Sequence, residues 1–221
     1  ACGRKAGGHC AHRRIAQRRA RRRRARSPPA MQVVKLGGSL LHDPLLPAWL
    51  SRLATQGAGQ IVIVPGGGPF ADAARAVQKE WRVNELCAHN MAVLGMAQCA
   101  HLLHGIEPRL ALADSEAGLR ARLAEGRAAI WLPLTLQRDA PDALTNWDAT
   151  SDSLAAWLAL RLGARGVALV KSCPVPAQAT PAELAAAGIV DRAFPGYAEQ
   201  CARAGIACSV LTRTDIDRAI S

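Results

Sequence analysis

The sequence predicts an α/β fold, a three-layer αβα sandwich around an open and mostly parallel sheet. Short apolar runs alternate with helix-like segments along residues 31–221 of the 221-residue chain. Glycine and proline mark the boundaries between these segments at regular intervals. Half of the residues are hydrophobic (50%) and 20% are charged, so the chain is able to bury a substantial core. One domain accounts for this region.

Six segments are predicted as strands because each is a short run of mainly apolar residues. Residues 61–64, Ile-Val-Ile-Val, are typical, since a continuous β-branched run is expected of a strand buried on both faces. In chain order the expected strands are residues 32–36, 61–64, 109–112, 128–132, 167–170 and 207–211.

The segments between the strands are predicted as helices from the spacing of their apolar residues. Residues 151–162 have Leu154, Trp157 and Leu158 on one face, and Gly163 follows as an end signal. Residues 134–147 are polar and are expected to be irregular. The expected helices are residues 47–56, 70–81, 85–103, 115–124, 151–162, 181–187 and 197–204.

The basic charge of the chain is confined to its first thirty residues. Eleven of the 28 Lys and Arg residues lie in residues 1–30, which hold no Asp or Glu, so the remaining 17 balance the 17 acidic residues. We therefore expect no nucleic acid to bind through the folded domain, residues 31–221. Residues 1–30 are interpreted as a disordered or non-native extension. An arm that binds nucleic acid or an anionic surface, and a transit peptide, are the alternatives.

Hydropathy and cysteine usage indicate a protein of the cytoplasm. No stretch approaches the roughly 18 to 20 uninterrupted apolar residues of a membrane span, so we expect no membrane partner. The cysteines are odd in number, seven, and form no Cys-x-x-Cys pair, which indicates reduced thiols.

Glycine-rich turns and lysines follow three of the expected strands. In an open parallel sheet, ligands bind beyond the carboxyl ends of the strands. Glycines there let the backbone turn tightly and aim its N–H groups at an anion, although glycine also simply makes tight turns. Two such loops with two lysines predict a site for several phosphates. The segments are Lys35-Leu36-Gly37-Gly38-Ser39, Pro65-Gly66-Gly67-Gly68-Pro69 and Lys171-Ser172.

A fourth polar segment precedes the helix expected at residues 151–162. Part of the pattern is N-cap chemistry, with Thr150 or Ser151 as the cap. Capping does not account for the asparagine and two aspartates of this segment, Asn146, Asp148 and Asp152. Asp152 either stabilises the helix dipole or orients the lysines and a metal ion.

Several other site classes are absent from the sequence. It has no G-x-x-x-x-G-K-[ST] motif, no G-x-G-x-x-G after a strand, no G-x-S-x-G and no H-E-x-x-H. His89, His101 and His104 share one helical stretch and are interpreted as hydrogen-bonded or surface side chains. No residues are therefore assigned as metal ligands.

The motifs quoted above resemble the amino acid kinase family. The resemblance rests on the order and spacing of the two glycine loops, of residues 150–156 and of the strand that ends in Lys171. Residues 66–75, 147–152 and Gly188-Ile189-Val190-Asp191 resemble a group of kinases for one-carbon carriers in methanogens and methylotrophs. That likeness implies a small-molecule acceptor such as (aminomethyl)furanmethyl phosphate, in methanofuran biosynthesis. We also expect a homo-oligomer.

The resemblance implies transfer of the γ-phosphate of ATP, with Mg²⁺ bridging the β- and γ-phosphates. Lys35 and Asp152 are the implied catalytic residues: the lysine neutralises charge on the transferring group, and the aspartate holds the lysines in place. The implied nucleotide-binding residues are Gly37, Gly38, Ser39, Lys171 and Ser172. The implied acceptor-binding residues are Gly66, Gly67, Gly68, Arg75, Asn146, Asp148 and Thr150.

Two other functions stay open for the folded domain. One is a kinase that phosphorylates a carboxylate of the amino acid type. The other is a non-catalytic protein that binds nucleotides or oxyanions on the same fold. The presence of both Lys35 and Asp152 favours catalysis, since a pure binder has less need of both.

Overall fold

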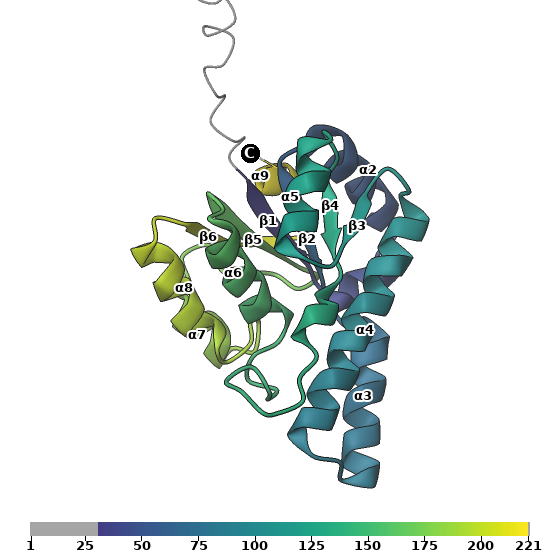
Figure 1. Ribbon diagram of the computed structural model, residues 1–221. Coiled ribbons are helices and arrows are strands. Elements are labelled where there is room, and N and C mark those ends of the chain that lie inside the picture. Colours follow the sequence, from purple (N-terminus) through teal and green to yellow (C-terminus); the bar gives the residue numbers. More distant parts are fainter. Residues whose placement is uncertain (1–30, 221) are drawn as a thin grey trace, which may run out of the picture. The chain divides into compact units, whose positions relative to one another are not determined.

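Six parallel strands form one sheet in the order β3-β4-β2-β1-β5-β6 (Figure 1). The structure, a computed structural model, describes residues 31–220. The predicted α/β class with a parallel sheet is confirmed. The strands are β1 Gln32–Leu36, β2 Ile61–Pro65, β3 Ala111–Ala113, β4 Ala129–Trp131, β5 Gly166–Lys171 and β6 Ala207–Thr212.

Helices cover both faces of the sheet. Successive side chains of β1 point to opposite faces, and each packs against a different set of helices. Val33 packs into the core with α5, α6 and α8, whereas Val34 packs into the core with α2 and α9. The helices are η1 Gly38–His42, α2 Leu46–Gln56, α3 Gly68–Trp81, α4 Glu85–Ile106, α5 Glu116–Ala124, η2 Pro133–Leu136, α6 Ser151–Leu162, α7 Pro181–Ala186, α8 Phe194–Arg203 and α9 Ile216–Ile220.

The observed elements differ from the predicted ones mainly at short or irregular segments. Helix α8 begins at Phe194 rather than at residue 197, because Pro195 occupies its first turn with a helical φ. Strand β3 begins at Ala111, two residues later than predicted. The two short 3₁₀ helices and α9 were not predicted, because segments of four or five residues show no helical period.

Helix α4 is long and apolar enough by length and composition to cross a membrane. Half of its most apolar window is buried inside the domain, and it contributes side chains to both cores. Packing in the domain thus accounts for its apolar character.

The interpretation of residues 1–30 as an extension concerns residues that lie outside the described part of the chain.

Candidate active site

One carboxylate joins two lysines at the carboxyl end of the sheet. Lys35 lies near the end of β1, and Lys171 ends the neighbouring strand β5. Asp152 comes from the first turn of α6. Its Oδ1 lies 2.7 Å from Nζ of Lys35 and its Oδ2 lies 2.6 Å from Nζ of Lys171. All three residues are buried, so Asp152 has the position that an orienting residue for both lysines needs.

Burial and neighbouring charges shift the pKa values of Asp152 and Lys171. Burial alone would raise the pKa of the Asp152 carboxyl, but the charges of Lys35 and Lys171 and their hydrogen bonds outweigh it and lower that pKa. Burial, aided by the charge of Lys35, lowers the pKa of Lys171 to about 8 despite the attraction of Asp152. With both lysines charged, the triad carries one excess positive charge, which suits an anionic ligand.

Asp191 fixes the N-terminus of α6 and thereby positions Asp152. Its Oδ2 accepts hydrogen bonds from the Thr150 amide at 2.8 Å and the Thr150 hydroxyl at 2.9 Å. Oδ2 also accepts from the Ser153 amide at 3.0 Å, and Oδ1 of Asp191 accepts from the Ser153 hydroxyl. The Asp191 amide in turn donates to Asp152 Oδ2 at 3.2 Å. The predicted cap is thus corrected: Thr150 stands at the N-cap, but the capping carboxylate comes from Asp191, 41 residues away.

The two glycine loops touch each other through their backbones. A Cβ on Gly38 would lie 2.4 Å from the backbone nitrogen of Gly68, and a Cβ on Gly66 would lie 2.4 Å from that of Gly38. Side chains at these positions would push the loops apart. Across the site, the hydroxyls of Ser39 and Ser172 lie 2.8 Å apart and join the first loop to the end of β5.

Only some of the glycine amides are available to a ligand. The Gly37 amide donates to the Val170 carbonyl at 3.3 Å, and the Gly66 amide donates to the Leu36 carbonyl at 2.8 Å. The predicted use of the Gly37 amide to hold phosphate oxygens is therefore corrected. Within residues 31–220, no hydrogen bond is found from the amides of Gly38, Gly67 and Gly68.

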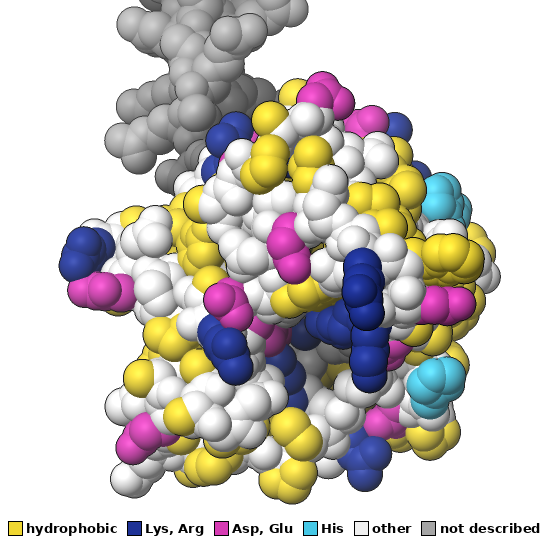
Figure 2. Space-filling model, turned by 90° about the horizontal axis from the view of Figure 1, so that it is seen from below, with side chains coloured by type: hydrophobic (Ala, Val, Ile, Leu, Met, Phe, Trp, Pro, Cys, Tyr) yellow, Lys and Arg dark blue, Asp and Glu magenta, His cyan; other side chains and the backbone are white. Residues whose placement is uncertain are grey.

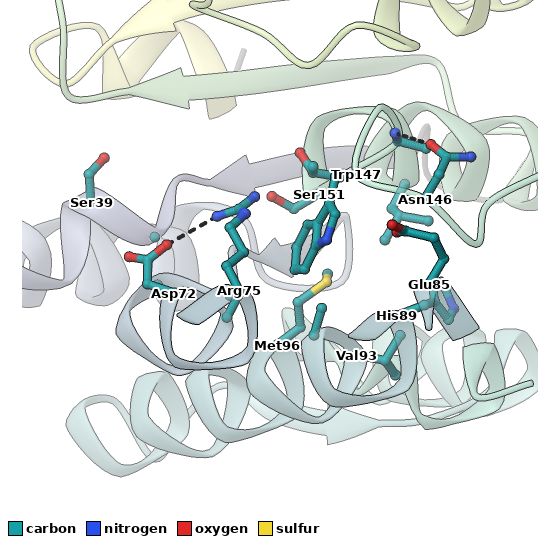
Figure 3. A pocket seen from close by; sticks show the side chains of 18 residues that line it. Ser39, Asp72, Arg75, Glu85, His89, Val93, Met96, Asn146, Trp147 and Ser151 are labelled. Atoms are coloured by element: carbon teal, nitrogen blue, oxygen red, sulfur yellow. Dashed lines mark hydrogen bonds and ion pairs between the residues drawn. The ribbon is translucent and has the colours of Figure 1, made fainter. Parts of the chain in front are cut away.

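A cavity of about 310 Å³ lies beside the glycine loops (Figure 3). Arg75 contacts Asp72 at 3.0 Å, and its guanidinium carbon lies 4.2 Å from the centroid of the Trp147 ring. The middle of the cavity is apolar, and its far end carries polar side chains of α4. The lining includes Gly38, Ser39, Gly67, Gly68, Asp72, Arg75, Glu85, His89, Val93, Met96, Asn146, Trp147, Thr150 and Leu154.

A larger cleft of about 870 Å³ opens on the other side of Arg75 and Trp147. Asp152, Lys171 and Arg192 line it, and the Arg75–Trp147 pair lines both the cleft and the cavity. Figure 2 shows Lys and Arg side chains gathered around a hollow on this face of the domain. A ligand in the cleft would therefore lie against Asp152 and Lys171, and a ligand in the cavity would adjoin it across Arg75 and Trp147.

Three predicted acceptor-binding residues have structural partners instead of free polar atoms. The Asn146 side-chain oxygen accepts from the amides of Asp148 and Ala149 at 2.9 and 3.2 Å, so it shapes its own loop. Asp148 lines the cleft rather than the cavity and lies 3.5 Å from Arg192. The Thr150 hydroxyl is bound to Asp191. All three lie near the site; the Asn146 oxygen and the Thr150 hydroxyl help to build it, whereas the Asp148 carboxylate is exposed beside Arg192.

The described side chains do not form a cage for a metal ion. No group of three or more His, Cys, Asp or Glu side chains suited to a metal occurs in the described part of the chain. Both oxygens of Asp152 already face lysines. His89 and His104 bond to the carbonyls of Leu136 and Leu110, in line with their interpretation as hydrogen-bonded side chains.

Comparison with known proteins places the chain among kinases. The sequence model of the amino acid kinase family matches residues 30–174. The (5-(aminomethyl)furan-3-yl)methyl phosphate kinase of Methanocaldococcus jannaschii is 32% identical over 142 residues, 62% of this chain and 63% of that protein. The match thus spans less than two thirds of the relative's length.

Solved structures of kinases share the fold. The uridylate kinase of Archaeoglobus fulgidus superposes with a TM-score of 0.62 at 16% identity, over 86% of this chain and 94% of that one. The UMP kinase of Ureaplasma parvum also gives 0.62, at 13% identity, over 86% and 92%. An isopentenyl phosphate kinase gives 0.55 at 16% identity, over 86% and 96%.

Proposed function

Because the chain belongs to the amino acid kinase family, we propose that it transfers the γ-phosphoryl group of ATP to a small acceptor that itself carries a phosphate. One observation carries this proposal: Asp152 and Lys171 of the Lys35–Asp152–Lys171 triad line the cleft, and the cleft adjoins the cavity along Arg75, Trp147 and Thr150. The cleft accommodates a nucleotide and the cavity a smaller molecule, since ligand sites span roughly 300 to 1,000 Å³.

The side chains of the site supply what phosphoryl transfer requires of a protein, which is positioning and neutralisation of charge. Lys35 and Lys171 neutralise negative charge on the phosphoryl oxygens, and the amide of Gly38 donates to one of them. Asp152 keeps the two ammonium groups at a fixed separation. Mg²⁺, which the family implies, supplies further neutralisation when it enters with the nucleotide.

The polar groups of the cavity favour an acceptor that needs no deprotonation. Asp72 is paired with Arg75 at 3.0 Å, and Glu85 and His89 lie on the far side of Trp147 from Arg75 (Figure 3), away from the end where the acceptor would meet the glycine loops. A phosphate monoester is already anionic near pH 7 and attacks without a general base. Arg75 and the free amides of the second glycine loop are the donors for its oxygens.

The relative from M. jannaschii supports a specific acceptor, (aminomethyl)furanmethyl phosphate, and with it a role in methanofuran biosynthesis. The test compares Mg-ATP turnover with this compound against turnover with UMP, aspartate and acetylglutamate. A preference for the furan phosphate is expected. A preference for either carboxylate would overturn the proposed acceptor, and absence of ATP turnover with every compound would favour a non-catalytic binder. The expected homo-oligomer stays a prediction.

The lowered pKa of Lys171 leads us to expect that kcat/KM falls at mildly alkaline pH. Its pKa of about 8 in the free protein means that it loses its charge, and its attraction for phosphate, above that pH. The negative charge of a bound nucleotide stabilises the charged form of Lys171 and so raises the pH at which the lysine loses its proton. We expect kcat/KM for ATP to fall with an apparent pKa near 8 and kcat to fall only at higher pH. Profiles of both constants from pH 6 to 10 test this, and a flat kcat/KM would contradict it.

A further inference from the structure

The two ends of the acceptor cavity carry different polar groups (Figure 3). At one end lie the free amides of the glycine loops and Arg75, whose guanidinium is paired with Asp72 at 3.0 Å. At the other end lie Glu85 and His89, one turn apart on the same face of α4. Figure 3 shows both side chains on the far side of Trp147 from Arg75. An elongated ligand would therefore meet donors at one end and acceptors at the other.

Glu85 keeps a carboxylate oxygen available at its end of the cavity. Its Oε1 accepts from the Gln78 amide at 3.0 Å, while no partner of Oε2 is found within residues 31–220. Gln78 in turn accepts from the Trp147 ring nitrogen at 2.5 Å. The Glu85 carboxylate is thus held in place beside the indole without being neutralised by a cation.

His89 adds a second acceptor at the same end. Its Nε2 lies 2.9 Å from the Leu136 carbonyl, and because a carbonyl oxygen only accepts, Nε2 must carry the hydrogen. In the neutral ring, Nδ1 then has a free lone pair, and no partner of Nδ1 is found in the described chain. A carboxylate and an imidazole nitrogen together match a ligand group with several N–H donors.

The middle of the cavity sets the shape of the ligand between these ends. Trp147, Met96, Val93 and Leu154 line it, and they offer one flat aromatic surface with apolar neighbours. The indole N–H is already bound to Gln78, and Ser151, which lies near Trp147 in Figure 3, offers a single hydroxyl, so a polar core such as a nucleobase would find few hydrogen-bond partners here. A small apolar or aromatic ring fits this environment.

We propose that Glu85, assisted by His89, binds a protonated primary amine of the acceptor at the end opposite its phosphate. The inference rests on the proposed function and names the residues that select the acceptor. An ammonium group has three donors and no acceptor, so it satisfies both side chains, whereas a hydroxyl has a single donor and no charge. Glu85 is then a specificity residue and takes no part in the phosphoryl transfer itself.

The main alternative role of Glu85 is structural. It stands in the first turn of α4, next to the N-cap Asn84, where a carboxylate stabilises the helix dipole. A structural role would affect all acceptors alike. The experiment must therefore compare acceptors that differ only at the amine.

The test measures kcat/KM for (aminomethyl)furanmethyl phosphate and for its hydroxymethyl isostere, in the full chain and in Glu85→Gln. The amide keeps the shape and the contact with Gln78 but loses the charge. We expect the variant to lower kcat/KM for the amine by about 10- to 100-fold and to leave the isostere within about twofold. Glu80→Gln, which changes an exposed acidic residue of α3 outside the cavity, is the matched control.

Each outcome has one meaning. If Glu85→Gln lowers kcat/KM equally for both acceptors, or for neither, the proposed amine site is overturned. The proposed kinase function is not affected by that result. Failure of the unaltered protein to phosphorylate either acceptor overturns the proposed acceptor class itself. A selective loss with the amine supports the inference, and partial return of the amine preference in Glu85→Asp would strengthen it.

Discussion

Replacing Asp152 by asparagine should abolish most activity and also destabilise the domain. The change keeps the shape of the side chain but leaves Lys35 and Lys171 as two buried cations without the carboxylate that both contact. Loss of one partner from a buried ion pair costs about 3 kcal/mol or more. Displaced lysines would lower turnover by about two orders of magnitude or more. Denaturant unfolding and steady-state kinetics at pH 7 measure the two effects.

The pH dependence of stability distinguishes this explanation from a simple loss of a helix-end charge. The pKa of Lys171 is about 8 in the fold, below its ordinary value of 10.5, so between these pH values the unfolded chain binds more protons. Stability therefore rises with pH in this window. The rise should be larger in Asp152→Asn, because the lysines lose the carboxylate that both contact, and only the more distant charge of Asp191 still favours the charged form of Lys171. A variant that loses about 1 kcal/mol or less and stays active would make Asp152 a mere helix-end charge.

A double variant provides the control. Adding Lys171→Met to Asp152→Asn removes one of the two uncompensated charges and should recover much of the stability at pH 7. Activity should not return, because a cation of the site is gone. Recovery of stability without activity would separate the electrostatic cost from the catalytic loss.

The parts of the site that could be predicted from the sequence are those encoded locally. Lys35 and Lys171 follow apolar runs that can only be strands, and the carboxyl ends of parallel strands meet at one edge. The glycines of the two loops are adjacent in sequence to those strands. Their close backbone contact, however, depends on the pairing of β1 with β2, and a single sequence does not give that pairing.

The parts that could not be predicted depend on contacts between distant segments. Asp191 caps α6 from 41 residues away, and the Gly188-Ile189-Val190-Asp191 motif was the only signal for it. Glu85 and His89 lie on α4, a helix apolar on most sides, so the sequence does not indicate which face lines a cavity. The predicted use of Asn146 and Asp148 as ligands stays a prediction: the Asn146 side-chain oxygen already accepts from amides of its own loop, and Asp148 is exposed 3.5 Å from Arg192.

Replacing Lys35 by methionine should lower kcat by about two orders of magnitude or more while the fold and the nucleotide affinity survive. Lys35 is 5% exposed, so its side chain is packed on all sides, and methionine rather than alanine is the appropriate replacement. The Asp152–Lys171 pair stays neutral and intact, but Asp152 Oδ1 is left buried without a partner, so we expect a loss of stability of about 1 to 3 kcal/mol. The positive charge of Lys35 lowers the pKa of Lys171. The Lys35→Met variant should therefore raise the pKa of Lys171, and nucleotide affinity should begin to fall at a higher pH than in the unaltered protein.

Lys171→Met is the partner of this experiment, and the two variants should fail differently. Lys171 lines the nucleotide cleft, so its loss should raise KM for ATP, whereas the loss of Lys35 should act mainly on kcat. Nucleotide binding by calorimetry between pH 6 and 10, with steady-state kinetics, measures both. Near-normal turnover in Lys35→Met would remove the basis of the proposed mechanism. An equal loss of nucleotide affinity in both variants would mean that the two lysines together bind the nucleotide phosphates. Neither lysine would then act specifically on the phosphoryl group that is transferred.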